Sequence, residues 1–430
     1  MKKINRSLSF VFLIIFLSGC ENQKKETTTE IVLTNISDLN LTDKSVALIK
    51  ESLSVTDSIN THPLVIFNTD TIPSQLDDLD GDGAWDELFF VTNFSPKEQK
   101  TIQLKWTDKT PEYPIRTSVR FGKREAMNEP VKAATEETVL ATDMPKKIGF
   151  QKYQTDGPTW ENDKVGFRHY LDGRNAKDIF GKKTPNISPE NVGINAEGAV
   201  EDNYHVMEEW GRDIFPVGNS VGLGGFALFV DNEIQRLGVT VNDTLSNIQE
   251  TNFRIIAEGP VKSVLKYTYN NWEAGGNSYN AEETTTIWPG MYGYKNTVEM
   301  ESLQGNETLL VGLSNINNEN PLIEVEIGDW VALIQHDSLT YERKWIMGTA
   351  ILVPKNKYQG YIEAPKEGQL TDSFLAKIEI ENKKPVSYYA IAGWALSADK
   401  NFKDAAYFKD YVVNLAKQLS TQITIDITTK

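Results

Sequence analysis

The segment from Asp202 to Asp213 contains the residue best suited to general base chemistry. It runs Asp-Asn-Tyr-His-Val-Met-Glu-Glu-Trp-Gly-Arg-Asp, and His205 is one of only four histidines in the chain. A neutral imidazole accepts a proton near pH 7, and a neighbouring carboxylate can orient the ring. The segment has no second His or Cys at a zinc-ligand spacing. Two interpretations of His205 remain: a catalytic base, and a surface or structural residue.

A second candidate is the extended segment from Val165 to Asp172. A strand period of two places Arg168, Tyr170 and Asp172 on one face and His169 on the other, among apolar residues. His169 is therefore predicted to be a core residue. A cation beside a phenol suits an acidic sugar, so the Arg168 and Tyr170 face is a candidate site. The alternative is a solvated strand face with an Arg–Asp pair.

Aromatic and amide side chains gather in the same part of the chain, between residues 153 and 225, where periodicity is weak. Sugars present C–H faces to indole rings and hydroxyls to amides and carboxylates. The alternative is aromatic filling of a β-sandwich core, above all for Trp288 and Trp394. Irregular segments on a sheet scaffold often build binding sites. The predicted sugar ligands are Trp160, Glu161, Asn162, Arg174, Trp210 and Asn219.

An acidic loop contains Asp78, Asp80 and Asp82, followed by Gly83 and Asp86. Carboxylates at alternate positions before a glycine are typical of the start of a calcium loop. The spacing departs from the twelve-residue EF-hand, so Asp86 would close a shorter loop. We predict a structural Ca²⁺ site formed by these four aspartates. The alternative is a plain acidic turn between two strands.

The N-terminus has the features of a lipoprotein leader. Lys2, Lys3 and Arg6 precede an apolar run over residues 8–17, which is too short for a spanning helix. The following Leu-Ser-Gly-Cys resembles a bacterial lipobox, which implies cleavage before Cys20 and lipid on its thiol. The alternative is an ordinary signal followed by a free cysteine.

Residues 1–19 are accordingly predicted to be a signal peptide and residues 20–30 a flexible tether. Loss of the three basic residues of the leader changes the net charge from −16 to −19. Glu21, rather than Asp, follows the cysteine, which by analogy favours the outer membrane, facing either the periplasm or the cell surface. No second apolar run reaches spanning length, so the lipid is the only predicted anchor.

Composition excludes several classes of partner. Lys and Arg total 44 against 60 Asp and Glu, and this acidic balance argues against nucleic acid binding. An anionic oligosaccharide remains compatible if it meets a local cluster of cations. The single cysteine excludes an internal disulfide. The chain shows no P-loop, dinucleotide fingerprint or nucleophile elbow, so we expect no organic cofactor.

Short alternating segments rich in Val, Ile, Thr and aromatics predict many half-buried strands. Helical periodicity is clear only over residues 404–419. The pattern predicts an all-β protein, a large antiparallel β-sandwich with a C-terminal amphipathic helix. We expect one domain over residues 31–430, in which residues 31–145 are a packed N-terminal subdomain. The strands are predicted over residues 101–106, 253–257, 261–269, 284–288, 323–327, 345–353, 374–380 and 423–427.

Several of these motifs together resemble one family, an uncharacterised-domain family of Bacteroidetes lipoproteins from polysaccharide utilisation loci. One of its characterised members is an ulvan oligosaccharide dehydratase. Residues 254–301 also resemble the galactose-mutarotase-like supersandwich shared by several polysaccharide lyases. The motifs that carry the family resemblance are Asp80-Gly-Asp-Gly with Asp86-Glu-Leu, Trp160-Glu-Asn-Asp-Lys, Asp172-Gly-Arg-Asn, Asp178-Ile-Phe-Gly-Lys and Tyr204-His before Trp210-Gly.

The resemblance implies removal of water from the terminal glucuronate or iduronate of an ulvan oligomer. Such a β-elimination needs a base at C5, a proton donor for the leaving hydroxide and a cation for the carboxylate. His205 is the predicted base, with Tyr170 second. Tyr170 is also the predicted acid, and Arg168 or Arg174 the cation. Two alternatives are a polysaccharide lyase using the same proton abstraction and a glycan-binding lipoprotein without catalysis.

Overall fold

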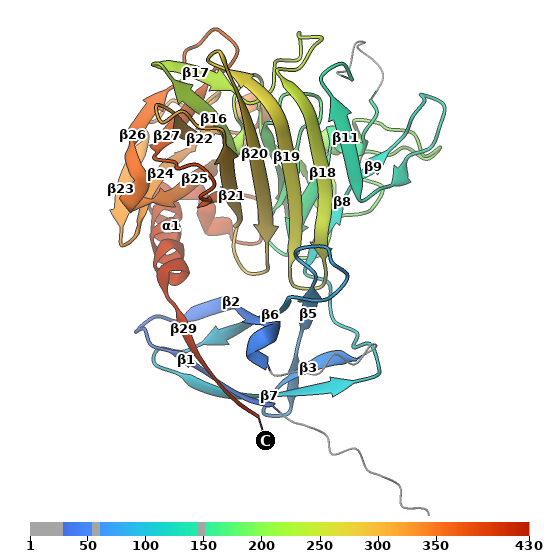
Figure 1. Cartoon of the computed structure of the whole chain (residues 1–430), viewed down its shortest axis with the longest axis vertical. Coiled ribbons are helices and arrows are strands. Elements are labelled where there is room, and N and C mark those ends of the chain that lie inside the picture. The colour runs from blue at the N-terminus through green and yellow to red at the C-terminus, as the bar shows by residue number, and fades with distance from the viewer. Residues whose placement is uncertain (1–28, 54–60, 144–150, 430) are drawn as a thin grey trace, which may run out of the picture.

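The computed structural model describes residues 29–53, 61–143 and 151–429. In these residues nearly all regular structure is antiparallel β-sheet, arranged as a small lower body and a large upper body (Figure 1). The predicted signal peptide and Cys20 lie outside the described residues. No helix in the described part of the chain is both long enough and apolar enough to cross a membrane.

The small body packs a five-stranded sheet on a three-stranded one. Its own core contains Ile31, Leu33, Val65 and Leu104, which alternate with more exposed residues as the strand period requires. The first sheet has the order β29-β1-β7-β3-β4 and the second β2-β6-β5. The bounds are β1 Thr29–Asn35, β2 Leu41–Ile49, β3 His62–Phe67, β4 Asp70–Ile72, β5 Ser74–Asp77, β6 Glu87–Phe94, β7 Gln99–Thr107 and β29 Ile423–Thr429, with the 3-10 turn η1 at Lys50–Leu53.

A nine-stranded sheet is the broad layer of the large body, ordered β11-β18-β19-β20-β21-β28-β25-β24-β23. Long strands rich in Thr, Tyr and Val stand side by side at its centre (Figure 1). Its strands are β11 Glu136–Leu140, β18 Ile248–Glu258, β19 Ser263–Ala274, β20 Asn277–Ile287, β21 Gly293–Glu301, β23 Ile323–Ile327, β24 Trp330–Asp337, β25 Met347–Pro354 and β28 Val386–Trp394.

Two five-stranded sheets cover this layer, ordered β15-β14-β13-β12-β8 and β17-β16-β22-β27-β26. A parallel bridge between Lys177 and Gly222 joins them at the β14–β16 contact. Their strands are β8 Thr117–Arg120, β12 Thr159–Asn162, β13 Gly166–His169, β14 Lys177–Lys182, β15 Gly211–Asp213, β16 Leu223–Val230, β17 Glu233–Arg236, β22 Thr308–Ser314, β26 Tyr358–Glu363 and β27 Ser373–Ile378. A short ribbon pairs β9 Gly122–Lys123 with β10 Lys132–Ala133.

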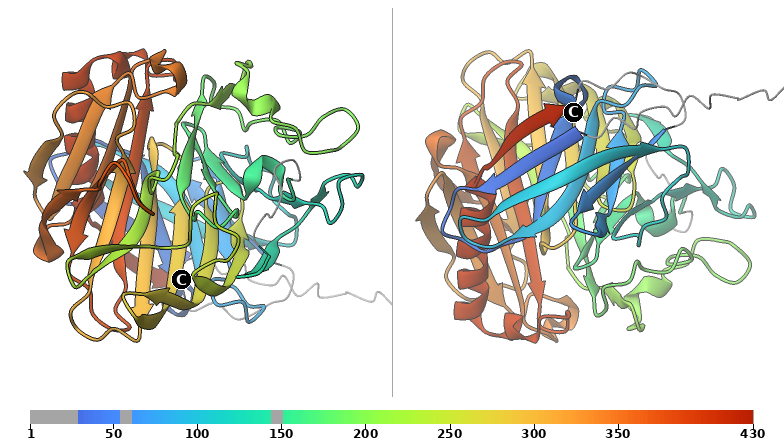
Figure 2. Two further views of the ribbon diagram at one scale, coloured as in Figure 1. Left: turned by 90° about the horizontal axis from the view of Figure 1, so that it is seen from above. Right: turned by 90° about the horizontal axis from the view of Figure 1, so that it is seen from below.

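The helix α1, Ala405–Ser420, begins where the Asp404 side chain accepts a hydrogen bond from the Tyr407 backbone N–H. It is the only α-helix among the described residues, and its buried stripe includes Phe408 and Val412, which pack toward β24 and β25. After it the chain returns to the small body, where β29 pairs with β1 (Figure 2, right). The remaining 3-10 turns are η2 Gln154–Asp156, η3 Asn203–His205, η4 Tyr341–Arg343, η5 Lys355–Lys357 and η6 Lys400–Lys403.

The all-β prediction with one late amphipathic helix is confirmed, and every strand expected from alternation overlaps a strand of the structure. The large body has one continuous core that runs from Val119 to Ala416, and Phe89 and Val91 of β6 in the small body pack into it. The small body is built from residues 29–107 and 423–429, whereas β8 onward pairs with the large body.

Candidate active site

One face of the sheet β15-β14-β13-β12-β8 carries the charged residues singled out from the sequence. Arg168 lies opposite Asp178 across β13 and β14, and Phe180 lies opposite Asp213 across β14 and β15. Because side chains on neighbouring strands share a face at such positions, all four project to the same side. A segment containing Tyr204 and Trp210 packs on Phe180 and covers this face. We call Arg168, Asp178, Asp213, Tyr170 and His205 the Arg168 cluster.

Arg168 is the centre of this cluster, and its side chain is only 1% exposed. Its guanidinium donates to Asp178, to the hydroxyl oxygen of Tyr170 and, over 2.8 Å, to Asp213 Oδ2. Its carbon lies 4.3 Å from the centroid of the Tyr170 ring. Since a buried guanidinium with two carboxylate partners has its charge compensated, Arg168 positions other groups and does not present a free cation to a substrate.

Asp213 is fully buried between Arg168 and Asp178. Burial and the neighbouring Asp178 carboxylate raise the pKa of Asp213 well above its ordinary value, although Arg168 opposes the shift. Two carboxylates that share one guanidinium in this way favour a bound proton.

His205 lies at the outer edge of the cluster, in η3. Its Nδ1 is 3.7 Å from Asp213 Oδ2, and its side chain is 42% exposed. Partial burial and the positive charge of Arg168 lower the pKa of His205. The ring is therefore neutral near pH 7, and Nε2 is the nitrogen that does not face Asp213. Those are the properties of a general base.

Tyr341 completes the surroundings of His205, although sequence patterns did not indicate it. Its ring meets the His205 ring edge to face at 5.7 Å, and its backbone N–H donates to Ile214 O. Burial, Asp213 and Asp178 raise the pKa of Tyr341, so its phenol keeps its proton. It comes from η4, more than 130 residues from His205, and only the fold brings the two rings together.

Tyr170 is more deeply placed than Tyr341. Its side chain is 5% exposed, and its hydroxyl donates to Asp178 Oδ2 over 2.7 Å. Burial raises its pKa well above the ordinary value. Tyr341, half-buried beside His205, is thus better placed than Tyr170 to deliver a proton to a ligand. This revises the sequence-based preference, because the spacing of Tyr170 gave no information about its depth.

Arg174 lies nearer the surface than Arg168. Its guanidinium lies 3.8 Å from the centroid of the Tyr170 ring and pairs with Asp172 over 2.6 Å. Both members of this pair are partly exposed, in contrast to Arg168. Arg174 is therefore better placed than Arg168 to meet a substrate carboxylate.

The predicted sugar ligands do not gather at one surface. Trp160 is fully buried and stacks on Phe167 at 5.8 Å. Glu161 binds Lys182, and the Asn162 side chain donates to two backbone carbonyls. A sugar-binding role for Trp160, Glu161 and Asn162 has no support from these placements, since alternation in sequence did not reveal that both faces of β12 are covered.

The other two candidates are Trp210, which lies beside the Arg168 cluster, and Asn219, which lies in the loop between β15 and β16. Trp210 is buried in the small group that includes Phe180 and Tyr204, where its ring supports the segment that carries His205. Asn219 is half-buried, and its carbonyl accepts from Arg236. Trp210 is thus a positioning residue in this arrangement.

The opposite face of the same sheet contains His169, as the strand period predicts. His169 is fully buried, stacks on Tyr267 with 4.3 Å between centroids, and has Nε2 3.2 Å from Asn175 Oδ1. Burial and Lys177 lower its pKa to about 4. Beside it, Lys177 pairs with Glu283 of the nine-stranded sheet over 2.5 Å, with both side chains fully buried.

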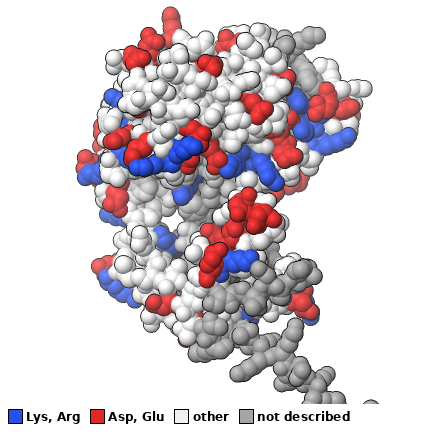
Figure 3. Space-filling view, in the orientation of Figure 1, with Lys and Arg blue, Asp and Glu red and all other residues white. Residues whose placement is uncertain are grey.

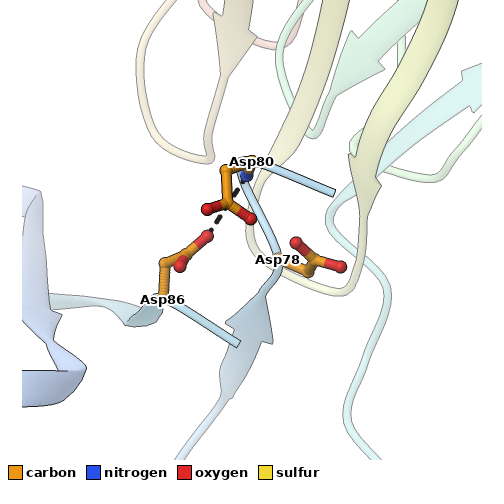
Figure 4. Close-up of side chains that lie close together, drawn as sticks. All are labelled: Asp78, Asp80 and Asp86. Carbon is orange, nitrogen blue, oxygen red and sulfur yellow. Dashed lines mark hydrogen bonds between the residues drawn. The ribbon is translucent and has the colours of Figure 1, made fainter. Parts of the chain in front are cut away.

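The acidic loop lies between β5 and β6. Carboxylate oxygens of Asp78, Asp80 and Asp86 all lie within 4.8 Å of one another (Figure 4), whereas Asp82 is not part of this group. Asp78 also accepts hydrogen bonds from the backbone N–H groups of Gly81 and Gly83. Three hard oxygen ligands suit Ca²⁺, and calcium binding here remains a prediction.

Comparison with known proteins places the chain in a family. Residues 33–425 match the family described as "Domain of unknown function (DUF4861)", and the chain belongs to that family. A relative, "Uncharacterized protein P7" of Formosa agariphila, is 24% identical over 98% of both chains.

Solved structures show weaker likeness. A glycosyl hydrolase family 38 protein from Enterococcus faecalis matches with a TM-score of 0.46 and 10% identity, over 93% of this chain and 47% of that one. An alpha-mannosidase from Enterococcus faecalis V583 matches with a TM-score of 0.46 and 12% identity, over 93% and 46%. The chain thus spans about half the length of these structures.

Proposed function

We propose that this member of the DUF4861 family is a hydro-lyase that acts on acidic carbohydrate. Its proposed reaction removes water from the non-reducing uronic acid of an ulvan oligosaccharide. The resemblance of its motifs to the dehydratase-containing family supports the substrate class. The observation that carries the chemistry is the half-exposed, neutral His205 beside the buried Asp213, with the Tyr341 phenol at its ring.

The proposed steps balance as a β-elimination. His205 takes the proton from C5, which is acidified by the adjacent carboxylate. The electron pair forms the C4=C5 double bond as the C4–O bond breaks. Tyr341 gives its proton to the departing oxygen, so water leaves, and the imidazolium later returns a proton to the tyrosinate. Arg174 offsets the charge that develops on the substrate carboxylate.

The buried members of the Arg168 cluster support these steps without touching substrate. Asp213 Oδ2 lies 3.7 Å from Nδ1 of His205, and the negative charge of the Asp178 and Asp213 pair stabilises the imidazolium that forms when His205 is protonated. Arg168 fixes Asp213 and Asp178, and Tyr170 is held by Asp178. A preorganised network of this kind lowers the reorganisation needed during proton transfer.

Mass spectrometry of ulvan oligosaccharides before and after incubation tests the proposal. Loss of one water without a change in chain length, together with the ultraviolet absorbance of a conjugated acid, is the expected result. Shorter products would show a polysaccharide lyase instead. Substrate recovered intact after long incubation would indicate a binding protein and contradict the proposed activity.

We further propose that the protein is an outer-membrane lipoprotein anchored through Cys20. The lipobox-like Leu-Ser-Gly-Cys and the polar stretch after it support this location. Cys20→Ser should move the protein from the membrane fraction to the soluble fraction. Retention on membranes after that substitution would contradict the lipid anchor.

A further inference from the structure

A groove lies where the small body meets the outer face of the nine-stranded sheet. Its cavity has a volume of about 460 Å³, within the range of small-molecule sites. Residues of β2 and β6 form one wall, and residues of β19, β20 and β21 form the floor. The space-filling view shows the hollow, with Lys and Arg side chains along the edge of the large body that faces it (Figure 3). We call this cavity the junction groove.

The junction groove continues into a second cavity of about 380 Å³ beside α1. Lys44, Ser45, Trp288 and Leu419 line both cavities, so the two share a wall. None of the residues of the Arg168 cluster lines either one. The groove is therefore a feature separate from the candidate active site.

The charges that line the junction groove are predominantly positive, in a chain with a net charge of −16. The lining includes four lysines and two glutamates. Lys262 pairs with Asp77 and Glu87, and Lys266 pairs with Glu282 over 2.8 Å. The other two, Lys44 and Lys295, form no ion pair with a carboxylate of the described residues.

Lys295 stands on the floor beside hydroxyl groups. It lies opposite Thr286 across β20 and β21, and Lys266 lies opposite Thr284 across β19 and β20. These four side chains project to one face of the sheet, and both threonines are half-buried. Within the described chain, neither Lys295 nor either threonine hydroxyl has a hydrogen-bond partner. The floor thus presents cations and hydroxyl donors together.

Lys44 and Lys295 are partly buried, and in the part of the chain that the structure describes no carboxylate pairs with either ammonium group. Desolvation lowers the pKa of Lys44 to about 8 and also lowers the pKa of Lys295, with Glu87 only partly opposing the shift. Lys44 is additionally bound to the Gln418 carbonyl, which is a neutral acceptor. An anion that entered the groove would stabilise both ammonium groups. Charge-assisted hydrogen bonds of this kind are stronger than neutral ones.

We propose that the junction groove is a second carbohydrate-binding site, which holds a sulfate or carboxylate group of an acidic sugar unit. Lys295 and Lys44 bind the oxyanion, and Thr284 and Thr286 donate to its oxygens. Tyr389, opposite Lys295 on β28, also belongs to the lining and adds apolar surface beside the two lysines. The carbohydrate nature of the ligand rests on the proposed function, whereas the preference for an oxyanion rests on the groove alone.

The test measures binding to a His205→Ala protein by isothermal titration calorimetry, so that turnover does not consume the ligand. The probes are a sulfated ulvan tetrasaccharide, the same sugar after desulfation, and the same sugar after reduction of its carboxylates. Lys295→Gln in this background should weaken binding of the sulfated probe at least tenfold, since it removes a charge-assisted hydrogen bond to the oxyanion. Lys377→Gln, on β27 and outside the groove, is the matched control.

The probes identify the bound group, because loss of affinity on desulfation assigns sulfate and loss on carboxyl reduction assigns carboxylate. Thermal unfolding of each variant shows that the fold is kept. Equal affinities for Lys295→Gln and Lys377→Gln would overturn the proposal, as would unchanged binding of a sugar that lacks both anionic groups. If the protein did not dehydrate ulvan oligosaccharides, the result for the groove would still hold, because binding is measured without turnover.

Discussion

The two faces of the sheet β15-β14-β13-β12-β8 have similar sets of charged and aromatic residues around them, but they differ in whether a ligand can reach those residues. On the inner face, His169 and Lys177 contact Tyr267 and Glu283 of the nine-stranded sheet; on the outer face, Arg168 and two aspartates lie beside His205 of η3. On both faces the buried cation is paired with a carboxylate. The composition of the two networks therefore does not separate a structural role from a catalytic one.

Access to solvent is what separates them. His169 is fully buried against Tyr267, whereas the side chain of His205 is 42% exposed. A base must reach the proton it removes, so only the outer network can meet a substrate. The inner network instead ties β14 to the nine-stranded sheet, because Glu283 also accepts from Tyr269 and Asn296.

The largest expected effect is on turnover in His205→Ala. General base catalysis contributes about 100- to 10,000-fold, so kcat should fall at least to the lower end of that range with the fold intact. KM should change less, because the interaction acts mainly in the transition state. Steady-state kinetics on ulvan oligosaccharides gives the measurement. His169→Ala is the control, with lower stability and retained specific activity. Near-normal turnover in His205→Ala would show that the outer network does not supply the catalytic base.

On the inner face, Lys177→Met should destabilise the protein by about 3–5 kcal/mol, because it leaves the Glu283 charge buried without its partner. Denaturant unfolding measures the change, and the double variant with Glu283→Gln should recover part of it. Lys355→Met removes an exposed pair with Glu326 and should cost less than about 1 kcal/mol. Equal losses in Lys177→Met and Lys355→Met would show that the inner pair has no special role.

The buried His169 predicts a dependence of stability on pH. Its folded pKa of about 4 lies below the unfolded value of about 6.5, so only the unfolded state binds the proton between them. Its contribution is complete above pH 6.5 and is lost as the pH falls toward 4, by about 3 kcal/mol in total. His169→Gln should flatten this part of the unfolding profile. An unchanged slope in the variant would contradict the buried, neutral imidazole.

Substitutions of Tyr341 and Tyr170 distinguish the residue that donates a proton from the residue that only positions other groups. If Tyr341 delivers the proton, Tyr341→Phe should lower kcat by about 100-fold, the lower end for acid–base catalysis. Tyr170→Phe, which removes a hydrogen bond to the buried Asp178, should lower stability and change kcat less. A larger loss of kcat in Tyr170→Phe than in Tyr341→Phe would identify Tyr170 as the proton donor.

The smallest effect concerns the acidic loop. Calcium at about ten times its Kd should stabilise the protein by about 1.4 kcal/mol, a rise of a few degrees in Tm. Chelator should reverse the rise, and Asp78→Asn with Asp80→Asn should abolish it. Turnover should not respond, because the loop belongs to the small body. A Tm that is insensitive to both calcium and chelator would favour a plain acidic turn.

Sequence patterns alone determined the fold class and the faces of individual strands. Alternation placed His169 with apolar neighbours and Arg168 with Tyr170, and both assignments agree with the structure. The periodicity of residues 404–419 predicted α1, Ala405–Ser420, to within one residue at each end. These properties are local, because the periods of strand and helix are fixed by backbone geometry.

Only the tertiary structure shows how deeply each side chain is buried and which side chains contact one another. The period of β12 does not show that both of its faces are covered, so spacing alone cannot show that Trp160, Glu161 and Asn162 are buried. Neither the approach of Tyr341 to His205 nor the lysines that meet at the junction groove can be derived from spacing. Each depends on which segments distant in the chain pack together, and burial and unmet charge exist only after that packing is complete.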